Sequence, residues 1–334
     1  MPTTSKIQHV VIIVKENHSF DNYFGSYPGV AGEILDPAQN PPPYDPDHRH
    51  EIWMKREADP RYHVQYKEQD LPAYFDLARK FTLCDHYFSE VAGPSTPNHL
   101  MLIAAAAPII NNPHNHYRPS PSAAYDLPSL PESLEKKGLT WGNYGGYPFQ
   151  YLRALKGHSG NHSTAAFVND ARNGRLPSVS WVYADGNPSL SEHPEQNVTQ
   201  GMAWTLEQIR AVAEGPLWNH TAIFLTYDDW GGWYDHVVPP VVETWHATMA
   251  QRPEDAFPQF EGQPFRYGSR VPCLVIGPYA KRGHVSTLLH SHVSLVRFCE
   301  DTFQLPHLNA RTQAASTMSD CFDFRPAPIP FPTS

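Results

Sequence analysis

Residues 7–14 read IQHVVIIV, a run that is nearly all apolar and rich in β-branched side chains. Such a run is typical of a strand that is buried on both faces in a parallel sheet. The polar segment KENHS follows at once, at residues 15–19. Ligands of open α/β sheets bind at the carboxyl ends of the strands. This stretch therefore predicts both a fold class and the edge of the sheet at which a functional site lies.

Two further apolar runs predict strands of the same sheet. Residues 221–226, TAIFLT, lead directly into YDDWGG at 227–232, and residues 271–276, VPCLVI, end at a Gly-Pro pair. Helices are predicted where apolar residues recur at helical spacing, or where a segment follows a turn or a cap residue. Asp70 is one such predicted cap. The predicted helices are 71–81, 96–107, 197–214 and 290–303. Alternating strands and helices predict an α/β fold with a mostly parallel central sheet and helices on both faces.

Many of the predicted connections between strands and helices are rich in proline. The chain holds 34 prolines among 334 residues, which implies long, rigid and irregular segments. Residues 28–59 are predicted to form a proline-rich excursion, and residues 324–334 an extended strap. The sequence contains no clear linker and no internal repeat, so we expect one domain over residues 1–334.

The composition excludes several classes of protein. With 40% apolar and 18% charged residues, the chain is globular rather than disordered. The net charge of −9 argues against nucleic acid as the main partner, because phosphate backbones require basic surfaces. The best candidate for a membrane span, residues 100–110, is too short and predicts a buried helix. The first residues lack the features of a secretory signal, so we expect a cytoplasmic protein or a trimmed exported one.

Four cysteines, Cys84, Cys273, Cys299 and Cys321, lie too far apart in the sequence for CxxC chemistry. We expect them to be mostly buried thiols. A bridge between Cys299 and Cys321 is an alternative that requires an exported protein.

The first candidate loop, residues 16–21, follows the strand predicted at 7–14. Glu16 and Asn17 supply oxygen ligands, which hard divalent cations prefer. The structural alternative is that Asn17 and Asp21 cap a helix that begins near Ser19, since such caps are common.

The second candidate loop contains Ser95 in the turn Gly-Pro-Ser at residues 93–95. A hydroxyl at the start of a helix lies beside free backbone N–H groups and the positive end of the helix dipole. This is a favourable place for a nucleophile that attacks phosphorus, because the amides also hold phosphoryl oxygens. The alternative is a simple N-cap, which is the commoner use of serine at a helix start.

The third candidate loop begins with the adjacent acids Asp228 and Asp229 at the end of a predicted strand. Two such carboxylates are costly unless a cation neutralises them. The glycines at 231 and 232 permit a tight turn that brings the backbone against a ligand. No GxSxG elbow and no Gly-rich P-loop occurs in the sequence.

Together these loops resemble, in order along the chain, the phosphoesterase family that contains bacterial non-specific phospholipases C and a group of bacterial acid phosphatases. The matching stretches are 11–25, 81–100, 176–194, 226–237 and 271–303. The resemblance implies an alkaline phosphatase-like three-layer sandwich with its active site at the carboxyl edge of the sheet. It also implies a phosphoester substrate, with phospholipid as one candidate.

The resemblance implies roles for particular residues. One divalent metal ion (Ca, Mg, Mn or Zn) would be bound by Glu16, Asn17, Ser95, Asp228 and Asp229. Ser95 would also be the nucleophile and would carry a phosphoserine intermediate. His193 would contact the phosphoryl group or protonate the leaving oxygen. His50 falls where family members often have an active-site histidine, with His48 as the alternative. Roles for His158, His162, His236 and His292 stay open.

Several functions remain in view at the sequence level. The first is a phospholipase C-like hydrolase, and the second an acid phosphatase that acts on small phosphomonoesters. Phospholipase C members are usually longer and often carry Asp-Glu where this chain has Asp228-Asp229, so phospholipid is an open choice. A sulfatase would place a modified Cys or Ser in a distinct motif, and Cys84 has no such context. The last alternative is a non-catalytic protein that binds a metal or another ligand.

Overall fold

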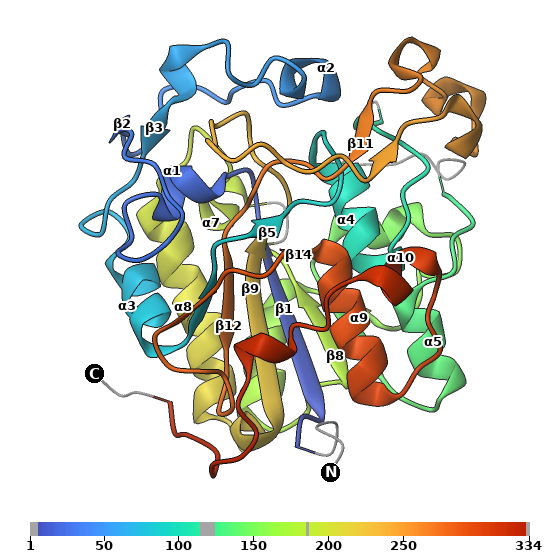
Figure 1. The fold of residues 1–334 in the computed structure, drawn as a ribbon. Coiled ribbons are helices and arrows are strands. Elements are labelled where there is room, and N and C mark those ends of the chain that lie inside the picture. The colour runs from blue at the N-terminus through green and yellow to red at the C-terminus, as the bar shows by residue number, and fades with distance from the viewer. Residues whose placement is uncertain (1–5, 114–123, 185–186, 332–334) are drawn as a thin grey trace.

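An eight-stranded sheet forms the centre of the computed structural model, which describes residues 6–113, 124–184 and 187–331 (Figure 1). In spatial order its strands are β13 (His284–Ser286), β4 (Thr82–Cys84), β12 (Cys273–Ile276), β9 (Thr221–Tyr227), β1 (His9–Lys15), β8 (Val179–Val182), β6 (Trp141–Tyr144) and β7 (Asn161–His162). Neighbouring strands are parallel except at β12, which runs antiparallel to both β4 and β9. The predicted mostly parallel α/β sheet is confirmed.

The three strands predicted from apolar runs are all present. β1 and β9 lie side by side in the middle of the sheet and are paired over their whole lengths. Every residue of β9 is buried, and so are all residues of β1 except the first. Continuous apolar runs suit these positions because both faces of the sheet are covered. The run at 271–276 contains the strand β12, whose antiparallel direction cannot be read from an apolar run alone.

Helices cover both faces of the sheet (Figure 1), as predicted. On one face α3 (Pro72–Lys80) and α6 (Thr164–Arg172) pack against α8 (Val198–Glu214). On the other, α4 (Ser95–Ala104) and α5 (Leu130–Lys136) pack against α9 (His292–Phe303). The four predicted helices therefore exist, with ends that differ by a few residues. This arrangement is the three-layer sandwich implied by the family resemblance.

Short helices, short strands and 3₁₀ turns complete the described structure. They are α1 (Phe20–Phe24), α2 (His50–Trp53), α7 (Pro188–Ser191), α10 (Ala310–Ala314), β2 (Asp36–Pro37), β3 (Val64–Gln65), β5 (Tyr87–Phe88), β10 (Glu243–Thr244), β11 (Pro264–Arg266), β14 (His290–Ser291), and the 3₁₀ turns η2 (Pro60–Tyr62), η4 (Tyr147–Tyr151), η5 (Trp218–His220), η6 (Ala247–Met249), η7 (Pro253–Asp255), η8 (Pro258–Phe260) and η9 (Ser319–Cys321). The proline-rich excursion at 28–59 thus contains only β2 and α2 and is otherwise irregular.

The cap predicted for α3 is wrong. The residue that precedes this helix is Leu71, which makes no side-chain cap, and the helix begins at Pro72. Asp70 instead accepts a hydrogen bond from the backbone N–H of Lys67, 2.9 Å away. Proline suits the first helical position because it has no N–H to leave unpaired. For α8, by contrast, Asn197 caps the start through a hydrogen bond from Thr199 N.

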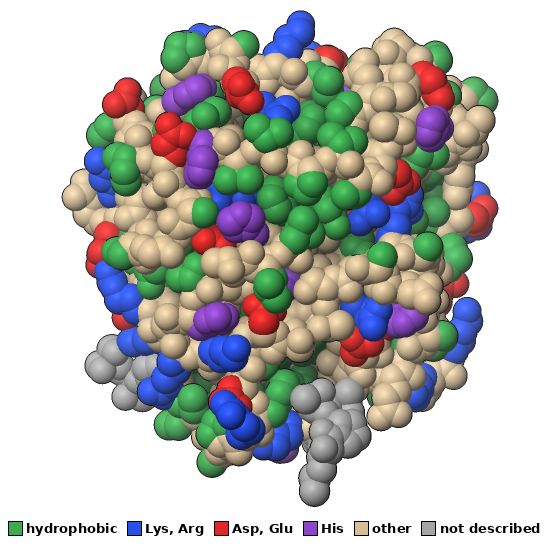
Figure 2. All heavy atoms as spheres, in the orientation of Figure 1, with side chains coloured by type: hydrophobic (Ala, Val, Ile, Leu, Met, Phe, Trp, Pro, Cys, Tyr) green, Lys and Arg blue, Asp and Glu red, His purple; other side chains and the backbone are tan. Residues whose placement is uncertain are grey.

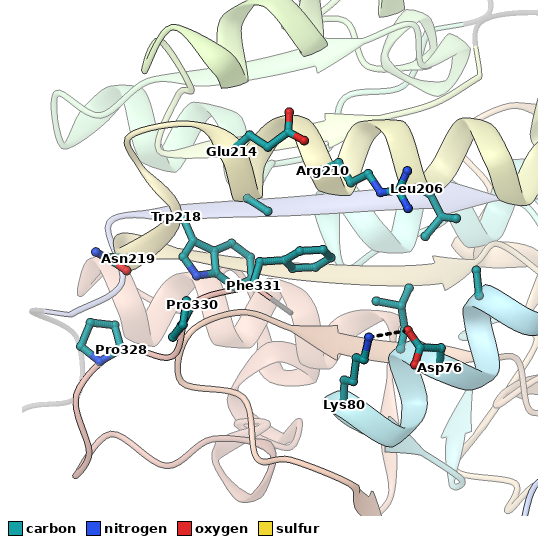
Figure 3. A pocket seen from close by; sticks show the side chains of 13 residues that line it. Asp76, Lys80, Leu206, Arg210, Glu214, Trp218, Asn219, Pro328, Pro330 and Phe331 are labelled. Carbon is teal, nitrogen blue, oxygen red and sulfur yellow. Dashed lines mark ion pairs between the residues drawn. The ribbon is translucent and has the colours of Figure 1, made fainter. Parts of the chain in front are cut away.

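The described part of the C-terminal strap, up to Phe331, crosses the amino ends of the strands; residues 332–334 of the predicted strap lie outside the described residues. The ring of Phe331 packs on Phe81 and Trp218, and the Trp218 indole N–H donates to Ile329 O at 2.8 Å. Between this strap, α3 and α8 lies a cavity of about 710 Å³, which Asp76 and Lys80 border with an ion pair (Figure 3). The cavity lies at the opposite edge of the sheet from the loops at residues 16–21 and 228–232.

The surface mixes charges of both signs. On the face in Figure 2, basic and acidic side chains are interspersed, and hydrophobic side chains gather near its centre. Among the described helices, none combines the length and the apolar character needed to cross a membrane.

A buried carboxylate in the loop after α7 connects this loop with β1, β9, α1 and α3. Glu192 lies 3.1 Å from the ammonium of Lys15, at the end of β1, and both side chains are fully buried. The hydroxyls of Tyr23, Tyr74 and Tyr227 all donate hydrogen bonds to the same carboxylate. Burial lowers the pKa of Lys15, and the charge of Glu192 opposes this shift. Glu192 therefore holds the loop that carries His193 against β1.

We expect Glu192→Ala to lower the free energy of unfolding by about 3–5 kcal/mol, because it leaves the Lys15 ammonium buried without its carboxylate. Urea unfolding followed by circular dichroism measures this change. Glu207→Ala, which removes an exposed carboxylate from the neighbouring helix α8, is the matched control. A Glu192→Ala variant as stable as the control would contradict the assignment.

Candidate active site

Three loops that lie far apart in the sequence meet at the carboxyl ends of β1 and β9. The Ser95 hydroxyl donates to Asp229 Oδ2 at 2.9 Å and contacts Asn17 Oδ1 at 3.3 Å. The backbone N–H of Asn17 donates to Asp228 Oδ1 at 3.0 Å. All four side chains are buried. The structure therefore brings four of the five residues predicted as metal ligands into direct contact.

Glu16, the fifth predicted ligand, is half-buried and follows β1 directly. Its backbone N–H donates to Ser191 O at 3.1 Å. Burial raises the pKa of Tyr183, and the charges of Asp228 and Glu16 raise it further. The Glu16 carboxylate thus lies near Tyr183, at the border of the site.

Backbone geometry fixes the contact between the first and third loops. Asn17 has a φ of 66°, in the left-handed region that few residues with a side chain adopt. Gly231 has a φ of 61°, and a Cβ built on it would lie 2.1 Å from Asn17 O. Only glycine fits at this close approach. Strain of this kind at a strand end is common at functional sites.

The capping alternatives for Ser95 and Asn17 do not hold. The residue that precedes α4 is Pro94, and Ser95 is the first residue inside the helix. Its hydroxyl is therefore free to point at Asn17 and Asp229. The cap of α1 is Ser19, whose hydroxyl accepts from Asn22 N at 3.3 Å, and neither Asn17 nor Asp21 has this role.

The two adjacent aspartates are electrostatically unequal. Burial alone would raise the pKa of Asp228, but the close contact with His99 lowers it to about 2. Burial raises the pKa of Asp229 well above its usual range, and the neighbouring charge of Asp228 adds to this effect. The pKa values of the two carboxyl groups are therefore shifted in opposite directions, and Asp228 is the more acidic of the pair.

The donor set fits a hard divalent cation. It consists of oxygen atoms only, from an amide, a hydroxyl and two carboxylates, which Mg²⁺, Ca²⁺ and Mn²⁺ prefer and Zn²⁺ also accepts. Asp228 Oδ2 is buried and completes no hydrogen bond among the described residues, although His99 Nε2 lies 3.2 Å away. An unsatisfied carboxylate oxygen next to a second carboxylate is costly, and a bound cation would relieve both costs.

Two histidines flank the amide of Asn17. Its Nδ2 lies 3.1 Å from His193 Nε2 and 3.3 Å from His48 Nε2. The other ring nitrogens contact backbone carbonyls, with His193 Nδ1 3.2 Å from Pro194 O and His48 Nδ1 2.8 Å from Pro46 O. In each ring Nδ1 therefore donates to a backbone carbonyl, and Nε2 is the nitrogen that faces the Asn17 amide.

His50 points elsewhere. Its Nδ1 lies 2.6 Å from Ala92 O and its Nε2 lies 3.0 Å from Gln263 Oε1. The side chain is fully buried, and neither nitrogen faces Ser95. Of the two histidines that the resemblance left open, the structure brings His48 to Asn17.

The remaining histidines are dispersed. His158 pairs with Glu135 at 3.2 Å, and His162 is exposed at the edge of the sheet. His236 contacts Asp21 at 2.5 Å, far along the loop from the paired aspartates. His292 alone among these four contacts the site: its Nε2 lies 2.6 Å from the backbone carbonyl of Asp228. It supports the loop rather than facing a substrate.

Sequence reasoning missed His99. It lies four residues after Ser95 on α4, so the two side chains share a face of the helix. Its ring packs against Tyr147 and Tyr183, with centroids 5.4 and 5.5 Å away. The four-residue spacing of Ser95 and His99 could have indicated that both side chains lie on one face of a helix. Only the fold shows that this face contacts Asp228.

With this geometry in view, comparison with known proteins decides the family. The phosphoesterase family model matches residues 7–63 and 46–306. This chain belongs to the phosphoesterase family. The family assignment made from the five sequence motifs is confirmed.

Curated relatives of this phosphoesterase are bacterial and plant proteins. It is 28% identical over 401 residues to the non-hemolytic phospholipase C of Burkholderia pseudomallei (strain K96243), covering 90% of this chain and 56% of that protein. It is 28% identical over 417 residues to phospholipase C B of Mycobacterium tuberculosis (strain ATCC 25618 / H37Rv), covering 97% and 79%. Similarity to non-specific phospholipase C6 of Arabidopsis thaliana is 26% over 336 residues, covering 84% and 63%. The chain thus spans little more than half of some relatives that it matches.

Solved structures share the fold at low sequence identity. Murine ectonucleotide pyrophosphatase/phosphodiesterase 5 matches with a TM-score of 0.56 and 9% identity, covering 95% of this chain and 100% of that chain. A putative sulfatase from Bacteroides thetaiotaomicron VPI-5482 matches with a TM-score of 0.55 and 9% identity, covering 94% and 74%. These likenesses support the alkaline phosphatase-like architecture and nothing finer.

Proposed function

We propose that this phosphoesterase hydrolyses phosphoric esters with Ser95 as its nucleophile, in the manner of a phospholipase C. The family and the names of the relatives point to the class of reaction. The observation that carries the residue assignment is the buried contact of the Ser95 hydroxyl with Asp229 and Asn17. The whole of residues 1–334 is proposed to act as one catalytic domain.

The proposed site holds one divalent cation through Asn17, Ser95, Asp228 and Asp229, with Glu16 at its border. Such a cation would lower the pKa of the Ser95 hydroxyl and offset negative charge on the phosphoryl oxygens. Asp229 Oδ2 accepts the hydrogen bond of the hydroxyl and aligns Oγ for attack on phosphorus.

The histidines beside Asn17 supply the proton transfers in this proposal. As Ser95 Oγ bonds to phosphorus, its proton passes to Asp229 Oδ2, and His193, protonated on both ring nitrogens, gives its Nε2 proton to the leaving alcohol. Asp229 returns its proton to Ser95 when the phosphoserine is later cleaved. A water molecule, deprotonated by the same imidazole, then hydrolyses the phosphoserine and frees Ser95. His48, on the other side of the Asn17 amide, would bind the phosphoryl group. The resemblance had offered His48 as the alternative to His50 for an active-site histidine.

We expect Ser95→Ala to lose turnover to the limit of detection while keeping the fold, because no other hydroxyl replaces Oγ. Rates on nitrophenyl phosphate and on bis-nitrophenyl phosphate measure this loss, and thermal unfolding checks the fold. The wild-type ratio of the two rates also decides between phosphomonoester and phosphodiester cleavage. Faster cleavage of the monoester would favour the acid phosphatase alternative.

Ser180→Ala is the matched control for this experiment. Ser180 is also buried, in β8, and its hydroxyl has no hydrogen-bond partner within the described residues. Its loss is expected to leave both rates unchanged. Turnover by Ser95→Ala at the wild-type rate would refute the assignment of Ser95 as the nucleophile. Inactivity of the wild type on a broad panel of phosphoesters would favour a non-catalytic protein that binds a ligand.

Removal of the cation is expected to abolish turnover reversibly. Dialysis against a chelator, followed by return of Ca²⁺, Mg²⁺, Mn²⁺ or Zn²⁺ one at a time, measures both metal dependence and metal preference. Asp228→Asn combined with Asp229→Asn should prevent this recovery, because amides are weaker ligands than carboxylates for hard cations. Full activity after exhaustive chelation would rule out metal dependence.

His48 and His50 offer a matched pair. Loss of a residue that transfers protons or binds the phosphoryl group typically costs about 10²–10⁴-fold in rate, so we expect His48→Ala to lower kcat within that range. His50→Ala should lower the melting temperature, because it leaves Gln263 and the Ala92 carbonyl without their partner, and should change kcat little. Equal losses of kcat in the two variants would contradict this division.

A further inference from the structure

A second cluster of metal-ligating side chains lies apart from the active site. Cys84 at the end of β4, His290 in β14 and Cys321 in η9 are all buried, and one ligand atom from each lies within 4.8 Å of the other two. The two sulfur atoms are 3.8 Å apart, and Cys321 Sγ is 4.0 Å from His290 Nε2. All four cysteines are free thiols, as predicted, but the near neighbour of Cys321 is Cys84 and not Cys299.

The fold brings these residues together by two routes. Cys84 is paired with Cys273 on β12 and with Ser286 on β13, so these three side chains share one face of the sheet. Cys321 arrives from the C-terminal segment, where its carbonyl accepts hydrogen bonds from Thr82 Oγ1 at 3.2 Å and from Lys281 N at 2.9 Å. The position of Cys321 over Cys84 is thus fixed by its backbone.

The spacing suits zinc better than a disulfide. A disulfide requires sulfur atoms about 2.05 Å apart, far shorter than the separation here. Zinc binds cysteine sulfur at about 2.3 Å in a tetrahedron, which places two sulfurs about 3.8 Å apart. Sulfur and imidazole ligands also select zinc over the hard cations that suit the oxygen ligands of the active site.

Further polar groups adjoin the cluster. Asp320 Oδ1 lies 3.3 Å from His290 Nε2 and 3.8 Å from Cys321 Sγ. Ser286 Oγ lies 2.9 Å from the same imidazole nitrogen. His290 is fully buried, and its Nδ1 has no hydrogen-bond partner among the residues described. Two buried thiols and a buried imidazole thus adjoin a partly exposed carboxylate, and this set of donors is one that zinc prefers.

We propose that Cys84, Cys321 and His290 bind one structural zinc ion, with Asp320 as the fourth ligand. Binding displaces one proton from each thiol, together with the proton that His290 shares with Asp320, and involves no oxidation or reduction. The ion would join β4, β14 and the C-terminal segment. Its two cysteine ligands, Cys84 and Cys321, are 237 positions apart in the sequence. It would stabilise the packing of that segment on the sheet and take no part in the chemistry at Ser95.

Metal analysis of the purified full-length chain tests this site. Zinc per chain is measured after extensive dialysis for the wild type, for Asp228→Asn with Asp229→Asn, and for Cys84→Ser with Cys321→Ser. The Asp228 and Asp229 variant is expected to keep one tightly held zinc, and the cysteine variant is expected to hold one zinc fewer than the wild type. Cys299→Ser, which removes a buried thiol on α9 outside the cluster, is the matched control and should keep the zinc.

A second measurement on the wild type covers the case in which the double cysteine variant does not fold. Cobalt exchanged into the zinc site should give the near-ultraviolet absorption band of cobalt–thiolate bonds. Absence of tightly bound zinc and of this band in the wild type, or a Cys84–Cys321 disulfide in the purified protein, would overturn the proposal. Loss of the zinc from the Asp228 and Asp229 variant would do the same. None of these outcomes depends on turnover, so the site is tested separately from the proposed function.

Discussion

The candidate active site depends on two adjacent carboxylates that the fold keeps out of water at the end of the central strand β9. Asp228 and Asp229 are both fully buried, and the energetic cost of placing like charges there is high unless counter-charges and donors surround them. The described surroundings supply one imidazole, the backbone N–H groups of Asn17 and Gly231, and the hydroxyl of Ser95. These groups offset the energetic cost of burying the two carboxylates, and they place the Ser95 hydroxyl beside Asp229.

The segments around the two aspartates hold the loops of the site in fixed positions. β1 and β9 are paired along their whole lengths, so Asn17 and Asp228 emerge side by side at one edge of the sheet. The approach of Gly231 to Asn17 and the contact of His292 with the Asp228 carbonyl fix the third loop. Precise placement of reacting groups accounts for a large part of enzymatic rate enhancement, and loops fixed in this way would suit the nucleophilic role proposed for Ser95.

The chain also separates two kinds of ligand chemistry in space. Oxygen donors gather at the carboxyl ends of β1 and β9, where a hard cation would serve a reaction. Thiols and an imidazole gather on one face of β4 and β12, where the C-terminal segment crosses the sheet and a softer metal ion would serve stability. The second arrangement gives a physical reason for cysteines that are far apart in sequence and lie away from the Ser95 site.

The sequence by itself determined the features that follow from local pattern. Apolar runs fixed β1 and β9, helical spacing fixed α8 and α9, and the polar residues that follow the strands located the loops of Asn17, Ser95 and Asp228. Tertiary structure alone decided the features that depend on contacts between distant segments: the antiparallel direction of β12, the choice of His48 over His50 beside Asn17, the contact of His99 with Asp228, and the meeting of Cys84 with Cys321. The physical reason is that hydrophobic periodicity reports the burial of one segment, whereas the partner of a side chain is set by how segments far apart in the chain pack together.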